Sequence, residues 1–234
     1  NIENFAQLDV DRTLRRGLPE IVLAENKSPE DTARIAVEMA RHTSSALVTR
    51  ATPAHVEAMK KLSGEMDVQI HERARTVVVR QHGYMPPSTG GRVGILTAGT
   101  ADIPVAEEAR VVAEEMGCAV STHYDVGIAG LHRLFTPLKK LVEAEVDALV
   151  VAAGMEGALP SVVASLSDIP VIGIPTSSGY GYGGAGAGAL MSMLQSCSLG
   201  LAVVNIDNGV AAGAYAALIA NRAAKGRSKT APST

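Results

Sequence analysis

The stretch from Ala148 to Asn221 is almost free of charge. Of its 74 residues only Glu156, Asp168 and Asp207 are charged, and none is Lys, Arg or His. Charged side chains are rarely buried unless they are paired, so a stretch this poor in charge must lie largely inside a folded core. Each charge that remains there needs a structural or a chemical reason.

Short apolar runs alternate with helical stretches over residues 92–222. Continuous apolar strands separated by helices are typical of a parallel sheet covered on both faces. Right-handed crossovers then favour a doubly wound, flavodoxin-like α/β fold with five parallel strands. The expected strands are Val93–Thr97, Ala119–Tyr124, Ala148–Ala152, Val171–Ile174 and Ala202–Ile206, and the expected helices are Pro104–Met116, Leu131–Val142, Leu159–Ser165, Ala187–Gln195 and Val210–Asn221.

Residues 1–91 are richer in charge and predict a small mixed α/β domain that ends in a linker. Ser28-Pro29 and Thr52-Pro53 each offer an N-cap followed by a proline at the first helical position. Ala46–Thr49 and Thr76–Val79 are typical of strands. We therefore expect domains at 1–91 and 92–222 and a polar, basic, disordered tail over 223–234.

Composition excludes several classes of protein. Aromatic residues make up 3% of the chain, there is no Trp, and the net charge is −3, so a nucleic-acid partner is not expected. No apolar run is long enough to span a membrane, and the first residues lack the apolar region of a signal peptide. Two cysteines cannot form a disulfide framework. Together these features predict a cytoplasmic protein that binds no membrane.

Ligands of doubly wound sheets bind beyond the carboxyl ends of the strands, so the turns after the strands hold the candidate site residues. After the first strand, Ala98, Gly99 and Thr100 form a turn at a helix start that suits a phosphate. Asp102 is a candidate acceptor for ribose hydroxyls, and a helix-capping role is the alternative.

The second and third turns carry the candidate ionisable groups. Arg133 has the fork geometry for a phosphate, and His132 beside it could shuttle protons; a surface Arg and a cap or core His are the alternatives. After the third strand come Gly154, Met155 and Glu156. A carboxylate among small apolar residues suits an acid or a base, and helix-start electrostatics is the alternative.

The fourth and fifth turns complete the predicted edge. Six of the ten residues 179–188 are Gly, which allows close backbone approach to a ligand or a mobile lid. Asp168 precedes the fourth strand and is expected at the opposite edge. The binding candidates are Thr176, Ser177, Ser178, Gly179 and Tyr180 after the fourth strand and Asp207 and Asn208 after the fifth.

The two cysteines differ in context. Cys118 begins a strand and is expected to be a buried apolar residue. Cys197 lies in a polar loop between two serines and is the better nucleophile candidate, although from composition alone an inert thiol is the stronger reading. Neither cysteine belongs to a cluster with the spacing of metal ligands, so a metal requirement stays open.

Several motifs together resemble the LarB family and, more distantly, the PurE family of aminoimidazole ribonucleotide carboxylases and mutases. The resemblance covers nearly the whole chain. The motifs shared with LarB are Leu8–Arg12, Arg15–Glu20, Gly94–Thr100, Gly154–Gly157, Gly179–Gly181, Ser196–Ser198 and Val203–Gly209.

Two positions depart from the family patterns. The PurE family has a catalytic His directly before the Leu-Pro of the third turn, where this chain has Ala158, and Glu156 stands two places earlier. This departure favours LarB. Val210-Ala211 replaces the aromatic and glycine expected in LarB, at a helix start remote from the predicted chemistry.

The resemblance implies a reaction. Nicotinic acid adenine dinucleotide, CO2 or bicarbonate and water would give pyridinium-3,5-biscarboxylic acid mononucleotide and AMP, at the start of nickel-pincer nucleotide synthesis. Cys197 would act as the nucleophile and Glu156 as the base. No cofactor is firmly implied, although Mg²⁺ near phosphate or Asp207 fits the chemistry.

The topology places Cys197, which precedes the fifth strand, at the edge opposite Glu156. Either the glycine-rich loop redirects the preceding helix, or a neighbouring subunit supplies the thiol. The resembling families are oligomeric, and the resemblance implies an octamer, so we predict the second. An aminoimidazole ribonucleotide mutase and a non-catalytic nucleotide-binding module are the alternative functions.

Overall fold

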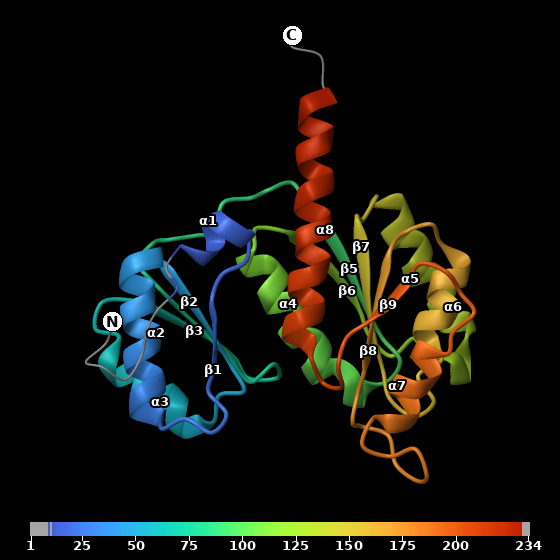
Figure 1. Cartoon of the computed structure of the whole chain (residues 1–234), viewed down its shortest axis with the longest axis horizontal. Helices are drawn as coiled ribbons and strands as arrows, with labels where there is room; N and C mark the ends of the chain where they lie inside the picture. Colours follow the sequence, from blue (N-terminus) through green and yellow to red (C-terminus); the bar gives the residue numbers. More distant parts are fainter. Residues whose placement is uncertain (1–8, 10, 231–234) are drawn as a thin grey trace. The chain divides into compact units, whose positions relative to one another are not determined.

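The computed structural model describes Asp9 and residues 11–230, which form two compact units divided between Pro86 and Pro87 (Figure 1). This division lies five residues before the boundary expected after residue 91. The connecting segment has no helix or strand between Arg80 and Arg92. Each unit has its own sheet and its own core.

The N-terminal unit contains a mixed four-stranded sheet in the order β1-β2-β4-β3. β1 runs parallel to β2, whereas β4 is antiparallel to both β2 and β3. Two of these strands were predicted, and the other two were missed. The strands are β1 Ile21–Leu23, β2 Ser45–Thr49, β3 Asp67–His71 and β4 Thr76–Arg80.

Within the described residues of this unit, two of the three helices begin where the sequence predicted. Ser28 caps α2 (Pro29–Thr43) by accepting the N–H of Asp31 at 3.0 Å. Thr52 caps α3 (Pro53–Leu62), where the His55 ring accepts the Thr52 N–H at 3.2 Å. The third helix is the short α1 (Arg12–Arg16). α2 and α3 pack against a core built mainly of Ala, Val and Met, including Val48 and Met59.

The second unit contains a five-stranded, all-parallel sheet in the order β6-β5-β7-β8-β9. This order is the doubly wound, flavodoxin-like arrangement, so the predicted fold class is confirmed. β9 is shorter than predicted, because the chain leaves the sheet after Val203. The strands are β5 Arg92–Thr97, β6 Ala119–His123, β7 Ala148–Ala153, β8 Val171–Pro175 and β9 Leu201–Val203.

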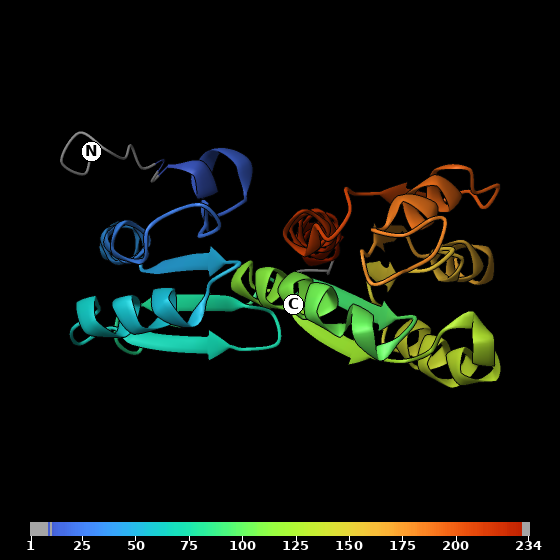
Figure 2. The same ribbon diagram turned by 90° about the horizontal axis from the view of Figure 1, so that it is seen from below.

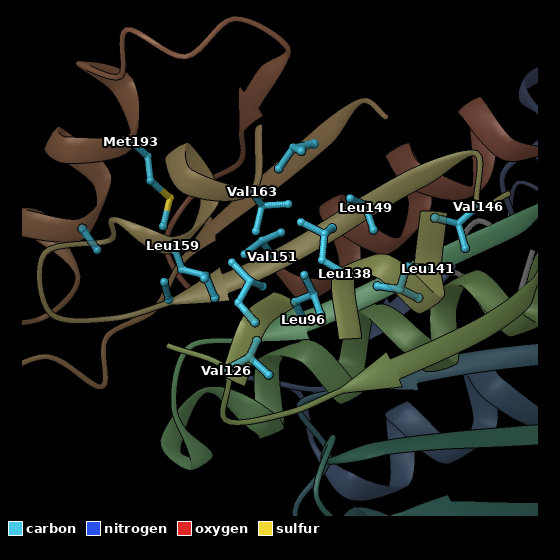
Figure 3. Close-up of a cluster of buried hydrophobic side chains, with 14 residues drawn as sticks. Leu96, Val126, Leu138, Leu141, Val146, Leu149, Val151, Leu159, Val163 and Met193 are labelled. Carbon is cyan, nitrogen blue, oxygen red and sulfur yellow. The ribbon is translucent and has the colours of Figure 1, made fainter. Parts of the chain in front are cut away.

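Helices cover both faces of this sheet (Figure 1). α4 (Ile103–Glu115) and α8 (Gly209–Thr230) lie side by side on one face, and α8 is seen end on in Figure 2. α5 (His132–Glu143), α6 (Leu159–Leu166) and α7 (Ala187–Leu194) lie on the other. Figure 3 shows the core under this second group, in which Leu96, Leu149 and Val151 of the sheet meet Leu138, Val163 and Met193 of the helices.

α8 corrects the prediction of a disordered tail from Ala223. The helix continues to Thr230, because Ala224 is buried and Arg227 is anchored to Asp147 and to the carbonyl of Gly90 at 3.0 Å. Disorder is therefore wrong for residues 223–230, and residues 231–234 lie outside the described part. Within the described residues, no helix is long and apolar enough to cross a membrane.

Candidate active site

The turns after four neighbouring strands meet at one edge of the parallel sheet. β5, β7, β8 and β9 are adjacent and parallel, so their carboxyl ends point the same way. The loop after β8 projects beyond the sheet at the bottom of Figure 1. The fold therefore gathers the candidate residues of the first, third, fourth and fifth turns along one edge, which we call the ligand edge.

Asp102 is the buried centre of the ligand edge. Its side chain belongs to a residue that is 3% exposed, and Oδ2 accepts the N–H of Gly99 at 2.8 Å. Oδ1 accepts the hydroxyls of Thr176 at 2.5 Å and Ser178 at 2.8 Å. Three hydrogen bonds offset the cost of burying this carboxylate. Asp102, the predicted acceptor for ribose hydroxyls, therefore already accepts hydrogen bonds from its own chain.

The turn after β5 offers less to a phosphate than predicted. The Gly99 N–H is donated to Asp102, and the carbonyl of Ala98 accepts the N–H of Gly127 at 2.9 Å. Thr100, exposed at the start of the short 3-10 helix η1 (Thr100–Asp102), keeps the position expected for a phosphate contact.

Gly154 brings the end of β7 against the loop after β8. A Cβ at this position would lie 2.2 Å from Ser178 Oγ and 2.9 Å from Thr176 Oγ1. Likewise a Cβ on Gly179 would lie 2.8 Å from the nitrogen of Met155. Both contacts require glycine, so the close backbone approach predicted for the glycine-rich run occurs, first of all, within the chain itself.

The turn after β9 holds the same loop from the other side. Asp207 Oδ1 accepts the N–H of Ser177 at 2.8 Å, and the Asp207 N–H is donated to the carbonyl of Pro175 at 2.9 Å. Asn208 Oδ1 accepts the N–H of Ala211 at 2.9 Å and so caps the first turn of α8. Asp207 and Asn208 therefore have structural partners at the ligand edge.

Glu156 lies in an exposed turn at the carboxyl end of β7. Met155 (φ +49°) and Gly157 (φ +61°) flank it, and the Gly157 N–H closes the turn onto the carbonyl of Gly154 at 2.8 Å. The side chain is exposed, so the apolar surroundings expected from the sequence are wrong within one chain. Its carboxylate is free to face solvent, a ligand or a second subunit.

Arg133 is partnered at the same edge. Nη1 donates to Asp125 Oδ2 at 2.7 Å, with both side chains about half exposed. Asp125 follows β6, and its N–H is donated to Thr97 Oγ1 at 3.0 Å. Asp125 was not among the predicted site residues, although its position after a strand signalled it. His132 is exposed at the start of α5.

Glu108 is a buried carboxylate that the sequence analysis did not single out. Glu108 on α4 is 5% exposed, and its Oε2 accepts the N–H of Val210 at 3.2 Å in the first turn of α8. A negative charge at a helix N-terminus is stabilising. The one signal for it in the sequence was an acid on the apolar side of a helix.

The thiol of Cys197 is exposed, in the loop between α7 and β9. Leu201, the first residue of β9, pairs with Val171, the first residue of β8. The carbonyl of Gly200 accepts the N–H of Val171 at 2.9 Å. The thiol therefore precedes the amino ends of the strands, and within one chain it lies off the edge opposite Glu156, as the topology predicted.

Cys118 differs from Cys197 in its burial. It is buried, its Sγ lies 3.2 Å from Asn221 Oδ1, and desolvation raises the pKa of its thiol to about 11. A thiol with this pKa is almost entirely protonated at neutral pH and is a poor nucleophile. The expectation of a buried apolar cysteine is confirmed.

The part of the chain that the structure describes contains no group of three or more His, Cys, Asp or Glu side chains arranged to hold a metal ion. Asp102 and Asp207 accept hydrogen bonds from three consecutive residues of the loop after β8, Thr176 to Ser178. Mg²⁺ near a phosphate stays a prediction.

The fold and the edge define a class of protein: a flavodoxin-like α/β domain whose polar groups gather at the carboxyl edge of its sheet. Residues 92–230 match the AIR carboxylase family, and residues 1–81 match the LarB/PurE-like N-terminal domain. An uncharacterized protein from Methanocaldococcus jannaschii is 46% identical over 94% of this chain and 85% of its own length.

Two similar proteins are N5-carboxyaminoimidazole ribonucleotide mutases. The one from Thermotoga maritima is 32% identical over 55% of this chain and 74% of its own length. The one from Pyrococcus horikoshii is 33% identical over 50% of this chain and 64% of its own length. With both domain matches, the chain belongs to the LarB family of PurE-related carboxylases.

Proposed function

We propose that this chain is a carboxylase and hydrolase that converts nicotinic acid adenine dinucleotide, CO2 and water to pyridinium-3,5-biscarboxylic acid mononucleotide and AMP. The observation that carries the proposal is the turn after β7. Ala158, at the start of α6, has no ionisable group, and Glu156 supplies an exposed carboxylate two residues earlier. A PurE-type reaction would lack its histidine at this position.

The carboxylation needs covalent help, because a pyridinium ring is too electron-poor to attack CO2. Addition of the Cys197 thiolate to the ring carbon next to the reacting carbon gives a neutral, electron-rich dihydropyridine. The reacting carbon then forms a bond to CO2, and Glu156 accepts the proton of that carbon. Departure of the thiolate restores the aromatic ring. Splitting one difficult step into easier ones is the purpose of such covalent catalysis.

The hydrolytic half of the reaction uses water to cleave the phosphoanhydride and release AMP. Thr100 at the start of η1 and Arg133 on α5 are the proposed phosphate contacts, and Tyr180 and Met155 are exposed apolar groups near the same turns. Backbone N–H groups at a helix start and an arginine fork both suit phosphate oxygens.

Two subunits are required if Cys197 and Glu156 serve one site. Met191, Leu194 and Leu199 expose more than 60% of their surface around the Cys197 loop. Exposed apolar groups of this size mark interaction surfaces. A homo-oligomer in which this surface covers a neighbour's ligand edge, octameric by family resemblance, would bring the thiol to the ring.

The test is incubation with nicotinic acid adenine dinucleotide and labelled bicarbonate. We expect label in a pyridine mononucleotide together with stoichiometric AMP. Tight dinucleotide binding without turnover would instead indicate a nucleotide-binding module. Conversion of N5-carboxyaminoimidazole ribonucleotide would indicate a mutase, the activity named for the Thermotoga maritima relative.

Mixing two inactive variants tests the shared site. Glu156→Gln and Cys197→Ser are each expected to be inactive alone. Co-assembled in one oligomer, they create sites with both intact groups if the thiol comes from a neighbour, and activity returns to about a quarter of wild type. Assembly without any recovery would place both groups in one chain.

A further inference from the structure

Three oxygen atoms at the ligand edge form a closed triangle of contacts. Asp102 Oδ1 lies 2.5 Å from Thr176 Oγ1 and 2.8 Å from Ser178 Oγ, and the two hydroxyl oxygens are 2.8 Å apart. Only two protons, one on each hydroxyl, are available to these three contacts, because an ionised carboxylate is an acceptor only.

Three arrangements of these two protons are possible. In the first, both hydroxyls donate to Asp102. In the second, Ser178 donates to Thr176 and Thr176 donates to Asp102; in the third, Thr176 donates to Ser178 and Ser178 donates to Asp102. In each arrangement the Ser178 proton stays inside the triangle. With both protons inside the triangle, one of the three contacts lacks a proton; an outward Ser178 proton would leave two of them without one, which is more repulsive.

Burial then decides which of the three groups can meet a ligand. Asp102 and Thr176 are 3% and 1% exposed, whereas Ser178 is exposed. Gly154 packs directly beneath Ser178 Oγ, and Asp207 holds the N–H of Ser177 at 2.8 Å. The Ser178 oxygen is therefore held in place, and Ser178 is the member of the triangle that a ligand can reach.

We propose that Ser178 is a hydrogen-bond acceptor for an O–H donor at the active site, and that Asp102 is the positioning residue that sets this polarity. The identity of the ligand rests on the proposed function. Asp102 thereby acts on the substrate through Ser178 instead of binding the ribose itself. The site accepts a hydroxyl donor at Ser178 and disfavours a ligand group that offers only lone pairs.

Two donors of this chemistry occur in the proposed reaction. One is a ribose hydroxyl of the nucleotide, which Ser178 would bind without any bond being made or broken. The other is the attacking water. In that case the water oxygen bonds to phosphorus as the bridging P–O bond breaks, the water proton moves to Ser178 Oγ, and the Ser178 proton moves to Asp102.

The polarity can be tested in the ligand-free protein. Neutron diffraction from crystals of the perdeuterated chain is expected to show the Ser178 deuteron directed at Asp102 or Thr176. A deuteron directed into solvent overturns the proposal. This measurement needs no substrate, so its outcome is independent of the proposed reaction. Failure of the proposed reaction would instead appear as an absence of carboxylation by the wild-type protein.

The donor is identified with nicotinic acid mononucleotide and its 2′-deoxy and 3′-deoxy analogues. If the donor is ribose, wild type and Ser178→Thr bind the ribonucleotide about two- to ten-fold tighter than one analogue. Ser178→Ala binds both equally, because it lacks the acceptor oxygen. Asp102→Asn reduces the preference, because an amide that accepts from Gly99 turns a donor toward Ser178 and occupies one of its lone pairs. Ser165→Ala, which removes an exposed hydroxyl on α6, is the control and keeps the wild-type preference.

Kinetics separate the second donor from the first. If the donor is water, none of the proteins distinguishes the analogues, and Ser178→Ala and Asp102→Asn lower kcat for AMP release about ten-fold or more with KM unchanged. Ribose discrimination that survives in Ser178→Ala but disappears in Asp102→Asn would show direct binding by Asp102 and overturn the proposal. An unchanged Ser178→Ala in both assays would overturn it as well.

Discussion

The two units differ in what their sheets can do for chemistry. The N-terminal sheet is mixed, with one parallel pair and two antiparallel pairs, so the carboxyl end of β4 lies at the edge opposite those of β1, β2 and β3. The second sheet is all-parallel, so every carboxyl end meets at one edge. Strand direction therefore concentrates polar groups in the second unit, which also matches the AIR carboxylase family. The predictions below test this difference between the two units, in order of decreasing expected effect.

Cys197→Ser is expected to have the largest effect. Loss of the nucleophile should lower carboxylation on the order of a thousand-fold or more, while the midpoint of thermal unfolding stays unchanged because the side chain is exposed. Cys118→Ala, the matched control, should keep the chemistry and lose about 1 kcal/mol of stability. Normal carboxylation by Cys197→Ser would remove the thiol from the mechanism.

Core truncations compare the two units directly. Leu149 on β7 and Met59 on α3 are both fully buried, in separate clusters, and each change to Ala should cost about 2–5 kcal/mol. Hydrogen exchange should show loss of protection confined to the unit that carries the change. Equal loss in both units from either variant would mean that the chain unfolds as one cooperative body.

Glycine substitutions separate a crowded site from an open turn. An Ala at Gly154 would displace Ser178 from Asp102, so we expect a stability cost of about 1–3 kcal/mol and a substantial fall in activity. Gly64 has φ +59° and no atom within 4 Å of an added Cβ. Gly64→Ala should therefore lower the free energy of unfolding by about 1 kcal/mol through backbone strain and leave the activity unchanged. Denaturation and turnover measured on the same samples test both expectations.

Acid should weaken the two units at different pH. Burial, and then the charge of Lys140, lower the pKa of His123 in the second unit from its ordinary 6.5. The folded state therefore favours the neutral ring, and stability is full above pH 6.5 and declines as the pH falls from there toward the lowered value. This effect is modest because the ring is only partly buried.

Asp67 in the N-terminal unit behaves differently. The N–H of Gly83, and then His82, lower the pKa of this carboxyl from 3.8. Its contribution is present above pH 3.8 and is lost as the pH falls through the lowered value. Hydrogen exchange across this range should show the second unit weakening first. His123→Gln and Asp67→Asn should each abolish one step, and a single shared step would contradict both assignments.

Local signals predicted most of the second unit. Its five apolar strands and intervening helices are visible because buried parallel strands and amphipathic helices have different periods. β1 and β3 were missed for physical reasons. β1 has three residues, and β3 is mostly exposed, so neither carries the apolar pattern of a buried strand. The α8 extension was missed because Arg227 is held by a residue far away in the chain.

The sequence predicted where the candidate residues lie, but not which of them form hydrogen bonds with one another. The carboxyl-edge rule located Asp102, Gly154, Ser178 and Asp207, since it depends only on strand order. The hydrogen bonds between them join turns that are 30 to 76 residues apart. Such pairings depend on the spacing of four neighbouring strands, which no local pattern records.

The sequence by itself determined the fold class, the helix starts at Ser28 and Thr52, and the edge of the sheet at which polar groups gather, because each depends on periodicity, capping or handedness. Only the tertiary structure decided that Asp102 is buried and bound to Thr176 and Ser178, and that Glu156 faces solvent. These properties arise from distances between side chains remote in sequence, and packing sets those distances.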